Sequence, residues 1–409
     1  TFFDGKGIDY IKIIAKMLKD ESEGIQVDWD RIHVFDFSSN KYVIGLNLLH
    51  KEREESHDMI AEQVLDILQN AYPDKESIWL ERFSKLAILS LLEHGGEHSI
   101  LGLEQILRKS PLFRKRVLAS LKSDLKQDWE EAKKELENYQ TTLPILNRMQ
   151  KIRYNQRMRR IFGQAHMSLD IQKWMDEGHI VLFSLKGLTE TERKMIIGYI
   201  ITQYHRQAHL RKKPNKEHFN FVDEFHLVQI PVVKQILSLD RACGHCLVAM
   251  TQYADQLERD IAQAFYGNVG TIIACKQGFQ SADILRRMSG DTIDANSLQH
   301  LRKFTAAVNT LNKKGDPITV YVETKPIPLY KPNGEPAYFG ENIARQEREE
   351  KEALKWVNKK IEELMARDCQ PVKKVDQWIE KYLRIDTIQQ EVKGEKHIED
   401  EENNDFILT

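Results

Sequence analysis

The sequence has little of what would place a protein in several common classes. Four cysteines among 409 residues are too few for a disulfide framework, and they favour a reducing compartment. No apolar run approaches the roughly 18 residues that a membrane helix needs. Neither sign of charge is in excess, since 60 Lys and Arg face 62 Asp and Glu, so any polyanion site must be a local basic stripe. What remains is an ordinary balance, 41% hydrophobic and 30% charged, in a chain long enough for about two to three domains.

Apolar runs of strand length occur in two parts of the chain. The first part holds runs at residues 1–4 and 32–35, and residues 8–18 between them have helical spacing. The second part begins at about residue 168, and its runs lie at 180–184, 219–222, 247–250, 269–274, 306–311 and 318–322. Continuous apolar strands separated by helices are typical of parallel sheets. The sequence therefore predicts an α/β fold with a mainly parallel sheet that is buried on both faces.

Residues 50–165 have a different pattern, because their apolar residues recur at helical intervals and no run predicts a strand. We therefore expect an all-helical domain inserted into the α/β core. Beyond residue 332 the chain is highly charged, with helices expected at about 341–367 and 375–383 and an acidic, disordered end. The expected organisation is a first part of the core (1–48), the helical insertion (49–165), a second part of the core (166–330) and a charged extension (331–409).

Two acids follow one of the apolar runs. Residues 219–222 lead directly into Asp223 and Glu224. In P-loop nucleoside triphosphate hydrolases, a buried strand ends in an acid that holds Mg²⁺, usually through water, and a following Glu can polarise the attacking water. The carboxyl end of such a strand is also where α/β sheets place their ligands. An ordinary strand end and turn would look the same, so the interpretation depends on what lies nearby.

A second polar residue strengthens the interpretation. Gln252 lies 28 positions after Glu224 and follows the apolar run at 247–250. An amide at that strand end can contact the γ-phosphate, whereas the alternative is a Gln in a surface turn. Two neighbouring strands that both end in polar groups predict a single triphosphate site.

The sequence lacks the other half of such a site. A P-loop needs Gly-x-x-x-x-Gly-Lys-Ser/Thr, and no such stretch occurs among the 409 residues. Residues 4–7, Asp-Gly-Lys-Gly, are too short to be that loop. The chain opens at Thr1 without Met, in what we expect to be a strand. We therefore expect it to be a fragment whose phosphate loop lies upstream.

The order of these segments resembles the conjugative coupling ATPases and their type IV secretion relatives, within the HerA–FtsK superfamily of DNA-pumping motors. The resemblance covers about residues 1–325, with Gly5 where the family has Pro. Its motifs are at residues 4–7, 167–182, 221–225, 241–244, 251–252 and 267–271. It implies a RecA-like P-loop NTPase core with an inserted all-helical domain, and ATP and Mg²⁺ as cofactors.

The resemblance also implies a role for each matching residue. Asp223 would hold Mg²⁺ through water, Glu224 would activate the attacking water, and Gln252 would sense the phosphate. Arg241 would match an arginine finger, whose guanidinium neutralises charge on the phosphoryl group of a neighbouring subunit. Such a finger requires a ring, and the family implies a hexamer. The alternative is that Arg241 is a solvated Arg at a helix end.

Two further arginines, Arg286 and Arg287, are rival candidates for the finger. The pair Cys243 and Cys246 resembles a redox motif. However, the second Cys enters an apolar strand and no second ligand pair follows, so we expect neither redox nor metal chemistry there. His226 we interpret as a strand-end His rather than a catalytic base.

Residues 148–160 hold six basic side chains and no acid. Such a stripe predicts salt-sensitive DNA binding that is independent of base sequence, whereas the alternative is a solvated helix face. The candidate DNA-binding residues are Arg148, Lys151, Arg153, Arg157, Arg159 and Arg160.

The resemblance implies an ATP-driven DNA translocase of conjugative transfer or type IV secretion that works as a ring. Its partners would be DNA, further copies of itself and other conjugation or secretion components. It would act in the cytoplasm or at the cytoplasmic face of the inner membrane, to which some relatives are anchored by residues before this region. Two alternatives stay open: an ATPase of the same machinery that moves protein for export or pilus assembly, and a non-hydrolysing structural or DNA-binding subunit.

Overall fold

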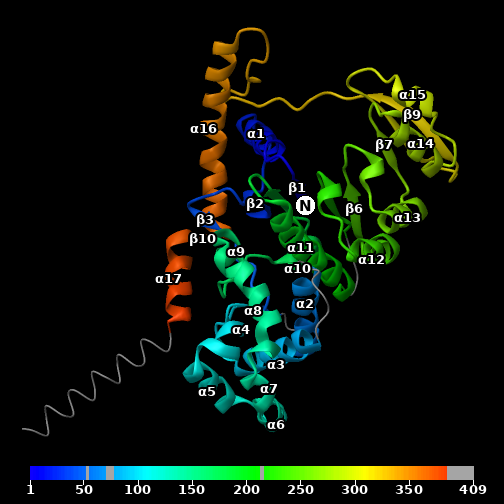
Figure 1. Cartoon of the computed structure of the whole chain (residues 1–409). Coiled ribbons are helices and arrows are strands. Elements are labelled where there is room, and N and C mark those ends of the chain that lie inside the picture. The colour runs from blue at the N-terminus through cyan, green and yellow to red at the C-terminus, as the bar shows by residue number, and fades with distance from the viewer. Residues whose placement is uncertain (52–54, 71–77, 212–215, 385–409) are drawn as a thin grey trace, which may run out of the picture. The chain divides into compact units, whose positions relative to one another are not determined.

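The computed structural model describes residues 1–51, 55–70, 78–211 and 216–384. The chain forms two units, and each is drawn from separate stretches of sequence (Figure 1). The first, here called the α/β unit, comprises residues 1–38 and 170–368. The second, the helical unit, comprises residues 39–169 and the chain from residue 369 on. In the described ranges, every helix is too short or too polar to cross a membrane.

The α/β unit is built on a five-stranded sheet in the order β2-β4-β1-β5-β6, in which every neighbouring pair is parallel. The strands are β1 (Phe2–Asp4), β2 (Ile32–Asp36), β4 (Ile180–Ser184), β5 (His218–Val222) and β6 (His245–Ala249). Parallel strands need long crossovers, and helices supply them here. These are α1 (Asp9–Ser22), α10 (Ile171–Glu177), α11 (Glu190–Leu210) and α12 (Val232–Leu239), with short 3₁₀ turns η1 (Trp29–Arg31), η3 (Phe225–Leu227) and η4 (Asp240–Cys243). The predicted α/β class is confirmed.

Stacked aromatic rings fill the middle of this sheet. Phe3, Phe35 and Phe183 come from three neighbouring strands and are fully buried. The ring centroids of Phe3 and Phe183 are 4.9 Å apart, and those of Phe35 and Phe183 are 5.1 Å apart. The pairing of β1 with β4 is therefore held by side-chain packing as well as by the backbone ladder.

The expected burial on both faces does not hold for β5. Its residues alternate between buried and exposed, and Phe219 and Phe221 on one face remain 41% and 40% exposed. Within the described residues, that face of β5 is only partly covered.

Three of the predicted strands form a separate sheet, so the expectation of one mainly parallel sheet is wrong for them. β7 (Ile272–Ala274), β8 (Thr305–Leu311) and β9 (Pro317–Glu323) pair in antiparallel fashion. Only residues 312–316 join β8 to β9, and a connection that short cannot return a strand in parallel orientation. The accompanying helices are η5 (Ala254–Gln256), α13 (Arg259–Asn268), α14 (Phe279–Met288) and α15 (Ala295–Gln299).

The expected C-terminal extension is not a separate domain, since its two helices belong to different units. α16 (Ile343–Asp368) lies along α1 in the α/β unit, where Val357 and Ile361 are among its buried residues (Figure 1). The side chain of Arg367 donates to the backbone carbonyls of Trp29 and Ile32 at 2.9 and 2.6 Å. α17 (Val372–Leu383) belongs to the helical unit. The acidic end expected to be disordered lies outside the described residues.

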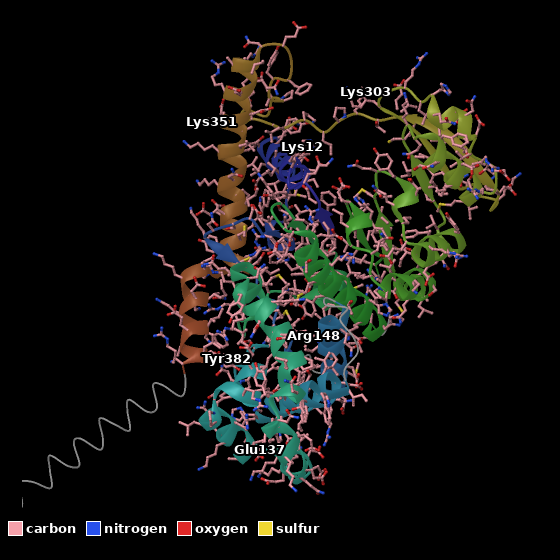
Figure 2. The ribbon with its side chains drawn as sticks, in the orientation of Figure 1. Lys12, Glu137, Arg148, Lys303, Lys351 and Tyr382 are labelled. Carbon is pink, nitrogen blue, oxygen red and sulfur yellow. The ribbon has the colours of Figure 1, made fainter. Side chains whose placement is uncertain are left out.

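The helical unit contains helices throughout the described part of residues 55–165, but it begins earlier than expected, at residue 39. Its helices are α2 (His57–Asn70), α3 (Ile78–His94), α4 (Gly102–Glu104), the π turn η2 (Gln105–Lys109), α5 (Pro111–Ser120), α6 (Ser123–Glu131), α7 (Lys133–Glu137), α8 (Tyr139–Tyr154) and α9 (Gln156–Phe162). Two short strands, β3 (Tyr42–Val43) and β10 (Gln370–Pro371), pair in antiparallel fashion. The hydroxyl of Tyr382 lies 3.0 Å from His98 Nδ1, which attaches α17 to this unit (Figure 2).

Candidate functional site

The turn after β1 brings the chain back across the carboxyl edge of the sheet. The carboxylate of Asp4 is fully buried and accepts hydrogen bonds from the backbone N–H groups of Lys6, Gly7 and Tyr10 at 3.1, 2.8 and 2.9 Å. Gly7 has a φ of +66°, and a Cβ there would lie 2.7 Å from Ser184 Oγ. The turn therefore depends on both the buried acid and the glycine.

The acid pair and Gln252 meet at this edge. Asp223 and Glu224 follow β5, Gln252 follows β6, and the two strands pair in register up to Val222 and Ala249. The side-chain amide of Gln252 donates to Glu224 Oε1 at 2.8 Å. The structure thus brings together the three residues that the sequence placed at two neighbouring strand ends.

Glu224 is held in an unusual backbone conformation. Its φ and ψ are 51° and 43°, in the left-handed region that non-glycine residues seldom adopt. The backbone on both sides is fixed, because Asp223 N–H donates to the Phe3 carbonyl at 3.0 Å and Phe225 N–H to the Met250 carbonyl at 2.9 Å. Such strain persists only where the surrounding structure imposes it, and it is common at functional sites.

Two basic groups lie near the Glu224 carboxylate. Lys6 Nζ is 3.9 Å from Oε1, and His226 Nδ1 is 3.6 Å from Oε2. The sequence interpretation gave no role to Lys6, although the Asp-Gly-Lys-Gly segment was the available signal. His226 also lies 3.4 Å from Thr251 Oγ1, which is consistent with a strand-end His.

Gly5 lies directly against the acid pair. A Cβ at this position would be 2.9 Å from Glu224 Cγ and 3.0 Å from Asp223 Oδ2. The absence of a side chain therefore allows the turn after β1 to approach both carboxylates.

The electrostatics of the site favour a cation. Burial raises the pKa of the Asp223 carboxyl above its usual value, and the nearby carboxylates of Glu224 and Asp4 add to the rise. Crowded carboxylate oxygens are the ligands that a hydrated Mg²⁺ ion prefers. Lys6 and the Gln252 amide could donate to one phosphate group. These residues fit the metal and the terminal phosphate, whereas the sequence offers no phosphate loop for the rest of a triphosphate.

Arg241 lies far from this site within its own chain. It is exposed on η4, at the amino end of β6, whereas Gln252 follows the carboxyl end. The five residues of β6 span about 16 Å at roughly 3.3 Å per residue. Within its own chain, Arg241 therefore does not reach the acid pair.

The rival arginines both have acidic partners. Arg286 is paired with Asp283 and Asp291. Arg287 Nη2 lies 2.7 Å from Asp283 Oδ2, and its side chain is 66% exposed. Arg287 is therefore the more accessible of the two.

The basic stretch of the helical unit is only partly on the surface. Arg148 on α8 is 4% exposed and donates to the Pro144 carbonyl at 3.2 Å (Figure 2). Arg153 lies 3.1 Å from the buried carboxylate of Glu104, and Arg160 binds both carboxylate oxygens of Asp376 at 2.8 and 2.6 Å. These acids come from distant parts of the sequence. Of the other three members of the predicted stripe, Lys151 is exposed, and Arg157 and Arg159 are half-buried.

Comparison with solved structures finds proteins that are similar to this chain at low sequence identity. One is the bacterial conjugative coupling protein TrwBdeltaN70, with a TM-score of 0.49, 10% identity, and 79% of this chain and 78% of that chain covered. Another is the plasmid coupling protein TrwB in complex with ADP and Mg²⁺, with a TM-score of 0.47, 14% identity, and 80% and 85% covered. A third is VirB4 of Thermoanaerobacter pseudethanolicus, with a TM-score of 0.48, 10% identity, and 80% and 82% covered.

No protein-family profile matches the chain, and no curated protein matches its sequence. At 10–14% identity, the similarity to the solved structures describes a shared arrangement of elements and not a shared activity.

The raised pKa of Asp223 predicts that Asp223→Asn stabilises the α/β unit at neutral pH. An acid whose pKa is higher in the folded state disfavours folding once it is ionised, and Asn removes that cost. We expect a higher urea midpoint for the variant at pH 7, with the gain shrinking as the pH falls to about 4, where the unfolded chain also binds the proton. Asp30→Asn, at a fully exposed side chain, is the control and should change little. A lower midpoint for Asp223→Asn at pH 7 would contradict the prediction.

Proposed function

We propose that the chain is the motor portion of an ATP-driven DNA translocase of conjugative transfer or type IV secretion, which works as a ring of identical subunits. The observation that supports the proposal most directly is the contact between Gln252 and Glu224, with Asp223 beside them, at the carboxyl edge of a parallel sheet. This edge is where α/β folds place nucleotides. The proposal places the protein in the cytoplasm or at the cytoplasmic face of the inner membrane.

Each residue would contribute a separate part of the reaction. Asp223 would hold the water shell of Mg²⁺, and the ion would neutralise charge on the phosphate oxygens. Glu224 would orient a water molecule for attack and accept its proton. The amide of Gln252 now donates to Glu224. If it donated to a phosphate oxygen instead, the Glu224 carboxylate would be released to bind water, which would couple nucleotide binding to activation of the base.

In the intact protein, Glu224→Gln should abolish hydrolysis while leaving nucleotide binding unchanged. The amide keeps the shape of the side chain but cannot accept a proton, and loss of a general base costs about 10²–10⁴-fold in rate. Phosphate release measures turnover, and binding of a fluorescent ATP analogue with Mg²⁺ measures affinity. Glu217→Gln, at the exposed residue just before the same strand, is the matched control and should retain full activity. Undiminished hydrolysis by Glu224→Gln would remove Glu224 from the mechanism.

We further propose that Arg241 acts on the site of a neighbouring subunit. The length of β6 keeps it away from its own acid pair, and its exposure makes it available to another copy. A guanidinium delivered across an interface would stabilise the charge on the transferred phosphoryl group.

This arrangement predicts that two inactive variants restore each other. Arg241→Ala and Glu224→Gln should each abolish hydrolysis alone. In an equal mixture, about one interface in four pairs an intact Arg241 with an intact Glu224, so about a quarter of the activity should return. Mixing Arg287→Ala with Glu224→Gln tests the rival finger in the same assay. A mixture with Arg241→Ala that stays inactive would argue against action between subunits.

The DNA-binding part of the proposal is carried by the helical unit. Lys151 on α8 is exposed, and Arg157 and Arg159 on α9 are half-buried, whereas Arg153 and Arg160 are bound to acids of the same unit. Lysine and arginine side chains that neutralise phosphates release counterions, which makes binding depend on salt but not on base sequence.

Replacing these three residues together by Ala should weaken DNA binding at low salt. The slope of log affinity against log salt should become less steep by about 2–3, since each phosphate contact contributes about 0.7–0.9. Fluorescence anisotropy with labelled DNA measures both quantities. The control replaces Lys126, Lys133 and Lys134, three exposed lysines of the same unit, by Ala. An unchanged slope would favour a motor of the same machinery that moves protein.

A further inference from the structure

Three histidines surround one buried carboxylate at the amino end of β6. Asp240 is fully buried, and its Oδ1 accepts hydrogen bonds from His205 Nδ1 at 2.7 Å and His209 Nε2 at 3.0 Å. Its Oδ2 accepts from His245 Nδ1 at 2.6 Å. His205 and His209 are one turn apart on α11, so both rings reach the same oxygen from one helix face.

The geometry of this cluster is close to that of a metal site. The ligand atoms of His205, His209 and Asp240 all lie within 4.8 Å of one another. A tetrahedral Zn²⁺ ion with nitrogen and oxygen ligands at about 2.0–2.2 Å separates those ligands by about 3.3–3.5 Å. The two nitrogen–oxygen distances in the cluster, 2.7 and 3.0 Å, are shorter than these separations by about 0.3–0.8 Å. Two His residues four positions apart on a helix are a recurrent zinc-binding arrangement.

The surroundings of the cluster orient it and leave one side open. His245 Nε2 lies 2.9 Å from the side-chain amide of Asn220, so the ring that holds Asp240 is itself held. The His209 side chain is 41% exposed. Cys243 Sγ lies 3.7 Å from His209 Nδ1, the ring nitrogen that does not face Asp240, so the thiol lies outside the group of ligand atoms and helps to orient the ring.

The hydrogen bonds of the cluster converge as the bonds to a metal ion would. His205 Nδ1 and His209 Nε2 both point at one carboxylate oxygen of Asp240, at 2.7 and 3.0 Å. A metal ion between these three atoms would take the place of the two shared protons, because each imidazole can carry a proton on its other ring nitrogen.

We propose that His205, His209 and Asp240 bind a divalent transition-metal ion of the Zn²⁺ class, with the fourth position open to solvent. Imidazole nitrogen ligands select this class over Mg²⁺, which distinguishes the site from the oxygen-rich edge at Asp223. The ion would attach the end of α11 to η4. This inference is independent of the proposed ATPase activity.

Titration of the metal-free full chain with Co²⁺ tests the proposal, because tetrahedral Co²⁺ has strong visible absorption and Zn²⁺ displaces it. We expect one equivalent of Co²⁺ per chain, displaced by Zn²⁺. His209→Gln, at a partly exposed residue, should keep the fold, as circular dichroism would show, and weaken Co²⁺ binding by at least about tenfold. Asp240→Asn should weaken it similarly. His300→Gln, at an exposed residue outside the cluster, is the control and should bind as the parent does.

The whole proposal is overturned if the parent chain gives no tetrahedral Co²⁺ spectrum, or if His209→Gln binds Co²⁺ as tightly as the parent. It is equally overturned if the spectrum is lost only in His94→Gln, because His94 and His98 form a second histidine pair, 2.8 Å apart, in the helical unit.

Discussion

The buried carboxylate of Asp4 is the group on which the candidate site depends. It accepts hydrogen bonds from the backbone N–H groups of Lys6 and Gly7 in the turn that follows β1 and of Tyr10 in α1, and hydrogen bonds to a charged group contribute about 1.5–3 kcal/mol each. That turn carries Gly5 against the acid pair and Lys6 towards Glu224. The parallel pairing of β1 with β5 and of β5 with β6 supplies the other half of the arrangement, because it brings three strand ends to one edge. A local hydrogen-bond network and a strand order thus act together to concentrate charge in one place.

Much of this edge could be predicted from sequence, because it follows from local signals. Two apolar runs, one followed by Asp223 and Glu224 and the other by Gln252, place these three residues at strand ends. Parallel pairing of the two strands then brings the strand ends to the same edge of the sheet. Lys6 was missed as a neighbour of Glu224 because its position depends on how the turn closes around Asp4. The same reasoning failed for β7, β8 and β9, where apolar runs were assigned to the main sheet. The connection between β8 and β9, residues 312–316, is too short for a parallel crossover and therefore indicates antiparallel pairing. The positions of the apolar runs alone do not contain this information.

Contacts between distant residues could not be predicted. Arg153 and Arg160 lie in a segment without acids, yet Glu104 and Asp376 reach them through folding of the helical unit. The histidine cluster shows the same limit, since Asp240 lies 31 residues beyond His209 and joins it only when η4 packs against α11. The Cys243 and Cys246 pair lies next to Asp240 in the sequence, but the two histidines that meet Asp240 come from α11 and not from the cysteine motif.

The left-handed backbone of Glu224 also restricts how its carboxylate can move. Because the peptide groups on both sides are bonded into the sheet, the carboxylate can change position only by rotation about its own side-chain bonds. Side-chain rotations of this kind are smaller motions than domain rearrangements, which take microseconds to milliseconds. Glu224 could therefore exchange its hydrogen-bond partner for a ligand without any movement of the sheet that carries it.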